Sequence, residues 1–127
     1  MGRHKITMVV EKTNTGYSAY SETDGVYTTG SALAELKQNM VDACNLQFEE
    51  QGRTITEADL NVVLDLPQFF EFYKEINATA LSKRIGMNQR LLAQYVSGRK
   101  KPSAQQVHRI LEGVRQVGKE LAEMDFA

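Results

Sequence analysis

Residues 78–99 read ATALSKRIGMNQRLLAQYVSGR, and this stretch decides the fold of the second half of the chain. Its apolar side chains occur where two short helices need them in order to pack across a tight turn: Leu81, Ile85, Met87, Leu92 and Tyr95. Ser82 is small where the helices would approach each other, and Gly86 occupies the turn, which favours a residue without a Cβ atom. The stretch therefore predicts a helix, a turn and a second helix.

The other helices of this half follow from capping residues and apolar spacing. Three residues suited to a helix N-cap occur here: Thr79, Asn88 and Ser103. They predict helices over 80–85 and 89–97 and a last helix after Ser103, and Pro67 opens a short aromatic helix before them. The last helix carries an apolar stripe: Val107, Ile110, Leu111, Val114, Val117 and Leu121. This stripe is either core for the helical half or, in part, a seam between two copies of the chain.

The first half shows the two-residue period of β-strands. Residues 5–20 are expected to form a hairpin, and residues 26–29 a third strand. Apolar residues then recur at helical spacing, which predicts a helix with Ser31 as its N-cap that stops at Gly52. Residues 60–66, which are rich in aliphatic side chains, form a fourth strand. The predicted order is β-β-β-α-β.

Composition and proline placement indicate the fold class. The chain has 127 residues, 42% of them hydrophobic and 24% charged, which is typical of one folded domain or two very small ones. Leu66-Pro67 is the expected boundary, because proline is accepted in a first helical turn and disfavours helix for the residue before it. We therefore predict an α+β protein, with one domain over residues 1–66 and an all-helical domain over residues 67–127.

Charge is divided unevenly between these domains. Residues 1–66 hold 5 Lys and Arg against 10 Asp and Glu, whereas residues 67–127 hold 10 against 6. Within residues 76–119, nine basic residues accompany one acid, Glu112. This asymmetry predicts that the second domain binds an anion, usually a nucleic acid, which would repel the acidic first domain.

Residues 79–117 resemble the lambda-repressor/Cro-like helix-turn-helix family, on the spacing around Gly86 and on the loop Ser97-Gly98-Arg99-Lys100-Lys101-Pro102-Ser103. The resemblance implies that helix 89–97 lies in the major groove of operator DNA. Its outward side chains are then candidates for reading base edges: Gln89, Arg90 and Gln94. Nearby basic side chains are candidates for contacting phosphates: Lys83, Arg84, Arg99, Lys100 and Lys101. A homodimer or higher oligomer would match a palindromic operator, whereas the plain alternative is that these are ordinary solvated side chains.

Residues 4–66 look like the N-terminal domain of HicB antitoxins. The matching residues are the strand Ile6-Thr7-Met8-Val9-Val10, Gly16-Tyr17 with Ala19, Asp24-Gly25, the helix entry Thr29-Gly30-Ser31, and Glu35. The resemblance implies a partial RNase H-like fold and a partner of HicA type, a small basic ribonuclease toxin that cleaves mRNA. Three acidic residues are the candidates for docking this toxin: Glu22, Asp24 and Glu35. A solvated acidic face is the alternative explanation of these acids.

The sequence predicts no catalytic residue, metal site or cofactor. Two-metal phosphoryl chemistry needs converging carboxylates, one usually in the middle of the first strand, and Lys5 to Val10 contain none. Cys44 is expected in the core, and the two histidines, His4 and His108, are far apart in the chain. No apolar run has the length of a signal-peptide core or a membrane span, so we expect a cytoplasmic protein without membrane partners.

Together, the two resemblances imply an antitoxin that inhibits a ribonuclease through residues 1–66 and represses its own operon through residues 67–127. One alternative is a stand-alone helix-turn-helix regulator whose first domain senses a small molecule. A residual nuclease is another, and the missing strand carboxylate argues against it. A neighbouring reading frame for a small basic, histidine-containing protein would favour the antitoxin.

Overall fold

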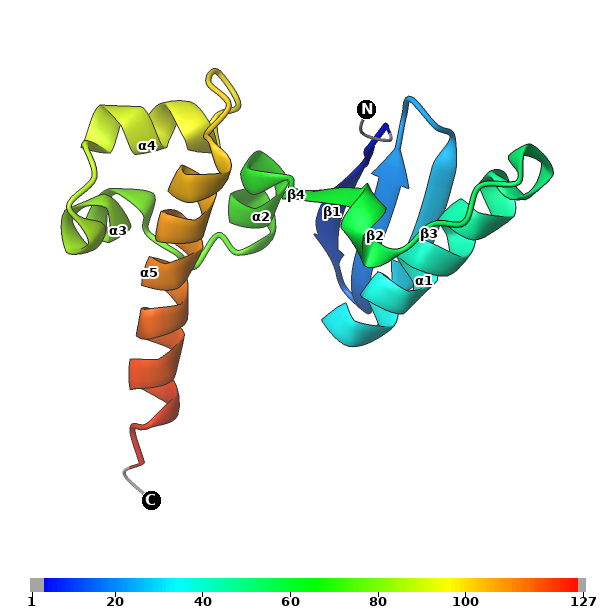
Figure 1. Ribbon diagram of the computed structural model, residues 1–127. Coiled ribbons are helices and arrows are strands. Elements are labelled where there is room, and N and C mark those ends of the chain that lie inside the picture. The colour runs from blue at the N-terminus through cyan, green and yellow to red at the C-terminus, as the bar shows by residue number, and fades with distance from the viewer. Residues whose placement is uncertain (1–3, 126–127) are drawn as a thin grey trace. The chain divides into compact units, whose positions relative to one another are not determined.

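The computed structural model describes residues 4–125, and the chain divides into two compact units, Met1–Phe72 (unit 1) and Tyr73–Ala127 (unit 2) (Figure 1). Unit 1 contains all the strands found in residues 4–125, and the part of unit 2 within that range consists of helices and the segments that connect them. The predicted α+β class is therefore confirmed. The first three residues of the predicted domain 1–66 lie outside the described residues.

Unit 1 is built on a four-stranded mixed sheet, in the order β3-β2-β1-β4. The strands are β1 (Ile6–Thr13), β2 (Gly16–Ser21), β3 (Val26–Gly30) and β4 (Leu60–Leu64). β1 pairs antiparallel with β2 and parallel with β4, and α1 (Leu33–Gln47) connects β3 to the segment before β4. The helix covers one face of the sheet (Figure 1), and the elements follow in the predicted order.

The core of unit 1 lies between α1 and that face. α1 contributes three buried side chains, Leu36, Met40 and Cys44, the last as predicted. The strands contribute the alternate residues that point toward the helix: Ile6, Met8, Val10, Ala19 and Val26. Because successive strand side chains point to opposite faces, the intervening residues lie on the face that α1 does not cover.

Ser31 does not cap α1, so this prediction is wrong. The helix begins two residues later, its N-cap is Ala32, and Ala32 makes no side-chain cap. Ser31 instead donates two hydrogen bonds to Glu35 Oε2, one from its hydroxyl and one from its backbone N–H. Gly52 does not end α1 either, because the helix stops at Gln47 with Phe48 as its C-cap; Gly52 ends a separate 3-10 helix over Glu49–Gln51, with a left-handed φ of 67°.

The division between the units falls after Phe72, whereas the sequence indicated Leu66-Pro67. α2 (Leu66–Phe72) belongs to unit 1 because the Gln68 side chain is bonded to the backbone of β1. The N–H of Lys12 donates to Gln68 Oε1 at 2.9 Å, and Gln68 Nε2 donates to the carbonyl of Lys12 at 2.7 Å. The backbone pairing of β4 with β1 ends at Leu64, and the Gln68 side-chain amide continues the hydrogen bonding along β1.

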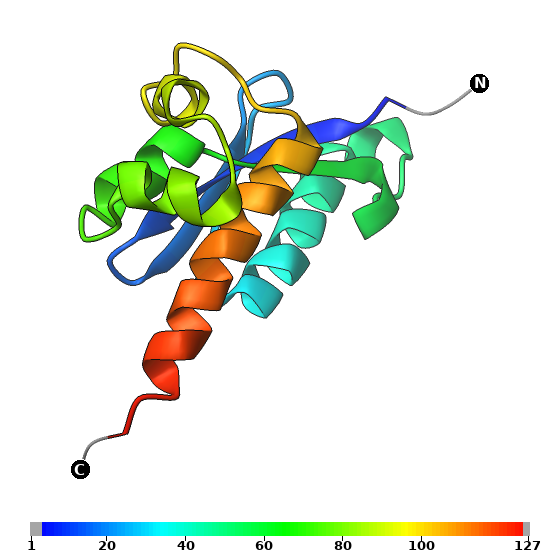
Figure 2. The same cartoon turned by 90° about the vertical axis from the view of Figure 1, so that its left-hand side faces the viewer.

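Unit 2 consists of α3 (Ala78–Ile85), α4 (Gln89–Val96) and α5 (Ala104–Ala122). Asn88 and Ser103 cap α4 and α5 as predicted, whereas Asn77 rather than Thr79 caps α3. Figure 2 shows that α5 extends well beyond the two shorter helices. Within residues 4–125, no helix is long and apolar enough to cross a membrane.

Candidate nucleic-acid interface

α3 and α4 are held together by a tight turn with a buried apolar interior. Gly86 has a φ of 68°, and the N–H of Met87 donates to the carbonyl of Ser82 at 2.9 Å. Ser82 is buried, and its hydroxyl donates to the carbonyl of Thr79 at 2.6 Å, so this polar side chain is satisfied within α3. The buried apolar residues of the unit are Leu81, Met87, Leu92, Tyr95 and Ile110. The positions that the sequence marked as core are therefore largely core.

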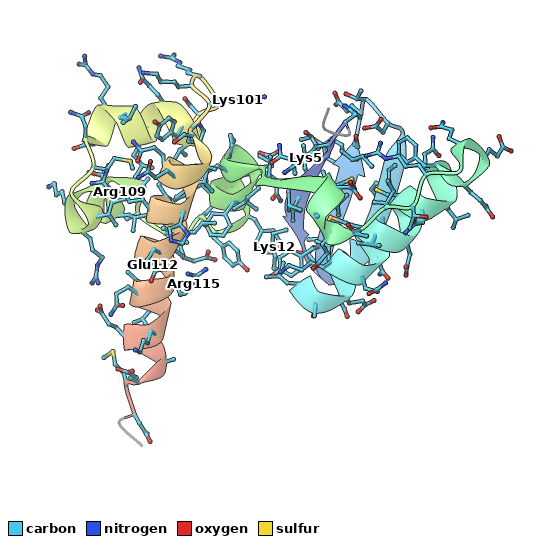
Figure 3. All side chains as sticks on the ribbon, viewed as in Figure 1. Lys5, Lys12, Lys101, Arg109, Glu112 and Arg115 are labelled. Carbon is cyan, nitrogen blue, oxygen red and sulfur yellow. The ribbon has the colours of Figure 1, made fainter. Side chains whose placement is uncertain are left out.

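α5 fixes the turn from the other side. Arg109 Nη2 donates to the carbonyls of Ile85 and Gly86, both at 2.9 Å, and so satisfies two carbonyls at the end of α3 (Figure 3). One turn further along α5, a Cβ atom on Gly113 would lie 2.3 Å from Ile85 Cγ2. The helices therefore approach closely at this glycine, and the orientation of α3 and the turn is set by α5.

The first turn of α4 presents two of the predicted base-reading residues to solvent. Gln89 and Arg90 are exposed and, with Asn88 and Ala93, line a hollow of about 610 Å³. Asn88 Oδ1 accepts from the N–H of Arg90 at 2.9 Å and from that of Leu91 at 3.1 Å, which fixes the helix start. Gln94, the third predicted reader, is only half exposed.

The loop after α4 carries three of the predicted phosphate contacts, Arg99, Lys100 and Lys101, all of them exposed. The N–H of Lys100 donates to the carbonyl of Gln94 at 3.2 Å, so the loop backbone is tied to the end of α4. Figure 3 shows Lys101 projecting from this loop. Residues 86–103, which form the turn, α4 and the loop, hold four Lys and Arg and no Asp or Glu. The turn, α4 and the loop therefore carry uniformly positive charge.

The two remaining predicted phosphate contacts lie on α3, and they differ from each other. Lys83 is exposed. Arg84 is also exposed, but it makes a two-pronged ion pair with Glu120 of α5, at 2.8 and 3.2 Å. The hydrogen bonds from Arg84 lower the pKa of Glu120, and the same pairing raises the pKa of Arg84. The charge of Arg84 is thus compensated within the unit.

Of the three predicted toxin-docking acids, Glu22 and Asp24 share one turn, and Glu35 lies apart from them. Glu22 is exposed in the turn between β2 and β3, where Asp24 Oδ2 accepts from the hydroxyl of Ser21 at 3.3 Å. Glu35 lies in the first turn of α1, beyond the opposite end of β3. The hydrogen bonds from Ser31 lower the pKa of Glu35. Asp24 and Glu35 therefore serve the local structure of a turn and of a helix start.

Glu11 and Asp65 are neighbouring carboxylates that the sequence did not predict to lie together. Val10 pairs with Leu64 across the parallel strands, and each acid directly follows one of these residues. Partial burial, then the charge of Asp65 and a hydrogen bond with it, raise the pKa of Glu11. The signal for this pair was the register of β1 against β4, which sequence periodicity does not provide. Among the described residues, no group of three or more His, Cys, Asp or Glu is arranged to hold a metal ion.

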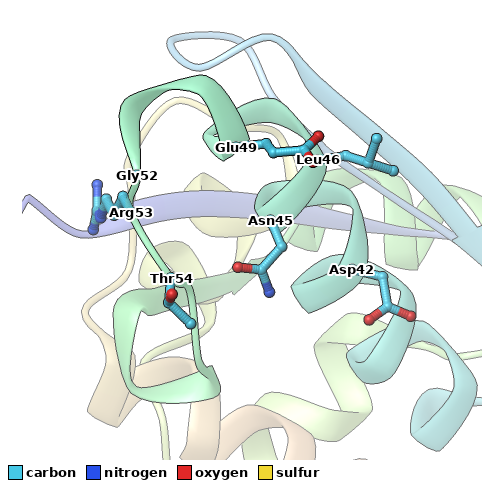
Figure 4. Close-up of a pocket in the computed structure, with 7 residues that line it drawn as sticks. All are labelled: Asp42, Asn45, Leu46, Glu49, Gly52, Arg53 and Thr54. Carbon is cyan, nitrogen blue, oxygen red and sulfur yellow. The ribbon is translucent and has the colours of Figure 1, made fainter.

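A second hollow, of about 520 Å³, lies where α1 ends and the chain turns back (Figure 4). Asp42, Leu46 and Glu49 line one side of it, and Gly52 to Thr54 line the other. Asn45, also in its wall, donates to the carbonyl of Ile55 at 3.0 Å and accepts from the N–H of Ile55 at 2.7 Å. This polar lining group therefore holds the returning segment in place.

Comparison of the chain with protein-family models, curated proteins and solved structures finds no match in any of the three. The resemblances to HicB and to the lambda-repressor/Cro-like family thus remain inferences from the sequence.

Proposed function

We propose that this chain is a HicB-type antitoxin that binds operator DNA through unit 2 and a basic ribonuclease toxin of HicA type through unit 1. The observation that carries the DNA-binding part is the exposed, uniformly basic surface formed by α4 and the loop after it. Residues 89–103, which form this surface, carry four cations and no anion. Such a surface attracts the phosphate backbone of a nucleic acid.

The side chains on α4 suit recognition of bases in the major groove. Arg90 can donate two hydrogen bonds to guanine, and Gln89 can pair with adenine. Lys100 and Lys101, at the other end of α4, have the charge and the reach for phosphates. The hold of α5 on the turn, through Arg109 and the close approach at Gly113, supports a rigid recognition element.

The charge of unit 1 supports a basic partner. Residues 1–72 hold 5 Lys and Arg against 11 Asp and Glu, a net charge of −6, whereas residues 73–127 hold 10 against 5. A small ribonuclease that binds RNA presents positive charge, which an acidic unit attracts over a distance and then covers. The same acidity keeps unit 1 away from DNA.

The far end of α5 supports pairing between two copies. Leu121 is 63% exposed and Met124, just past the helix, is 56% exposed. Val114 and Val117 are half-buried on the same helix, and Val114, Val117 and Leu121 follow one another at spacings of three and four residues. We propose that this stripe packs against a second copy, which would bring two α4 helices to half-sites about 34 Å apart.

The experiment that tests the DNA-binding part compares two variants, Arg90→Ala and Lys100→Ala, on DNA from upstream of the chain's own gene. Arg90→Ala should cost about 1–3 kcal/mol per half-site and relax the preference at one base pair. Lys100→Ala should weaken specific and non-specific DNA alike and lower the salt slope by about one per lost phosphate contact. Titrations at several salt concentrations measure both effects.

The proposal about α4 is refuted if Arg90→Ala behaves like Lys100→Ala, because α4 would then not lie in the groove. Co-expression of the full chain with a neighbouring frame that encodes a basic ribonuclease, followed by co-purification, tests the toxin-binding part. DNA binding without capture of the ribonuclease would favour a stand-alone regulator.

A further inference from the structure

The sheet face that α1 leaves uncovered carries a row of aromatic and aliphatic side chains across all four strands. The strand register pairs Tyr27 with Tyr20, Tyr20 with Val9, and Val9 with Val63. Directly paired residues of neighbouring strands have their side chains on the same face. This row lies opposite the core residues of β1, because Val9 alternates with Met8 and Val10.

The row remains accessible at both of its ends, which are the edge strands β3 and β4. Tyr27 is 68% exposed and Val63 is 39% exposed, and both are large apolar side chains. Tyr20 and Val9, between them, are half-buried. Large apolar side chains grouped on a surface are typical of interaction sites.

Three carboxylates accompany the row. Glu11 follows Val9 by two residues on β1, and Asp65 follows Val63 by two residues past β4, so both belong to the same face. Partial burial and the charges of Glu11, Asp65 and Glu22 raise the pKa of Tyr20. By register, Glu11 and Asp65 lie on the same face as the row. No Lys or Arg occurs at the positions of β1 to β4 whose side chains lie on this face.

We propose that this surface, the open sheet face (Val9, Tyr20, Tyr27, Val63, Glu11 and Asp65), docks a polypeptide that presents basic side chains. The inference rests on the proposed function, and the occupant is the basic toxin of that proposal. Tyrosine rings and carboxylates are the groups that receive Arg and Lys, through cation–π contacts and charge-assisted hydrogen bonds. Aromatic residues are also the usual energetic centres of protein interfaces.

Charge selects this occupant over a second copy of the chain. A two-fold contact through the open sheet face would bring Glu11 and Asp65 of one copy toward the same acids of the other, which is repulsive. A cationic side chain placed between Glu11 and Asp65 relieves the repulsion that already exists between them. The net charge of −6 on residues 1–72 acts in the same direction at longer range.

The test measures binding of the full chain to the basic ribonuclease encoded beside it, by titration calorimetry. Tyr27→Ala removes the most exposed member of the row and should weaken binding by about ten-fold or more. Leu46→Ala is the matched control, because Leu46 is 73% exposed but lies on α1, which packs on the other face. It should change affinity less than two-fold. Val63→Thr, which keeps the side-chain shape, should weaken binding as well, and circular dichroism reports whether each variant folds.

Each result of this experiment supports or refutes the toxin-binding function, the location of the docking surface, or both. If the wild-type chain does not bind the ribonuclease, both the toxin-binding function and this inference fall. If it binds, and Tyr27→Ala and Val63→Thr fold and bind as tightly as wild type, the function stands and the location is wrong. A loss with Leu46→Ala alone moves the interface to α1. If Tyr27→Ala instead abolishes self-association of the chain without the ribonuclease, the occupant is a second copy and the inference is overturned.

Discussion

Two glycines of α5 provide a matched test of the helix packing in unit 2. A Cβ atom on Gly113 would lie 2.3 Å from Ile85 Cγ2 and 3.3 Å from Leu81 Cδ1, whereas one on Gly118 meets nothing within 4 Å. Apolar carbons rest about 3.5–4.0 Å apart, so Gly113→Ala forces α3 and α5 apart by about 1 Å or distorts Ile85. Such overpacking costs about 1–3 kcal/mol, while replacing glycine by alanine within a helix gains about 0.8–1 kcal/mol.

Gly118→Ala should therefore stabilise unit 2 by about 1 kcal/mol, and Gly113→Ala should leave it unchanged or destabilise it by up to about 2 kcal/mol. Native-state hydrogen exchange of the amides of α3 and α5, measured in the full chain, reports the free energy of opening separately from unit 1. Operator affinity should fall with Gly113→Ala, because α5 orients the turn before α4. If Gly113→Ala protects these amides as much as Gly118→Ala does, the two helices do not meet at Gly113 and the reasoning fails.

Two further substitutions probe charge. Burial and Asp65 raise the pKa of Glu11, so ionisation of Glu11 costs stability as the pH rises through its pKa in the folded protein. Glu11→Gln should then raise the free energy of unfolding at pH 7 by about 0.2–1 kcal/mol. It should give no gain near pH 3, where the Glu11 carboxyl is protonated in both the folded and the unfolded protein. Urea titrations at the two pH values measure this, and an equal gain at both would contradict the prediction. Glu120→Gln leaves the charge of Arg84 uncompensated, so affinity for non-specific DNA should increase. The slope of log affinity against log salt concentration should steepen by about one. An unchanged slope would remove Arg84 from the candidates for phosphate contact.

Local patterns in the sequence predicted most of the secondary structure. The order of strands and helices follows from periodicity. Asn88 and Ser103 cap their helices and Gly86 takes the positive φ of its turn, as expected from their residue types. Ser31 shows where local chemistry misleads, because the residue is a good N-cap by type but donates to Glu35 instead. The preference of serine for the N-cap position contributes only about 1 kcal/mol, and here Ser31 bonds to the Glu35 carboxylate instead.

Contacts between distant segments were not predictable in this way. The pairing of Arg84 with Glu120 joins residues 36 apart in the chain and turns a candidate phosphate contact into a compensated charge. The neighbouring position of Glu11 and Asp65 depends on the register of two parallel strands. The row from Tyr27 to Val63 likewise appears only when three registers are known together. The residue types alone indicated the net charge of each half of the chain. The registers of the strands decide which side chains lie next to one another on the sheet.

The bonds between Gln68 and Lys12 also determine where this chain can be cut and rejoined. Because one side-chain amide completes the sheet beside β1, the number of residues between Leu64 and Gln68 is fixed, and an insertion there would carry the amide out of reach. A junction between the two units that leaves these bonds intact lies beyond Phe72, where the first unit ends. Exchange of the helical unit between related proteins, whether by recombination or by a designer, therefore has its natural junction after Phe72 and not at the proline that marks the sequence.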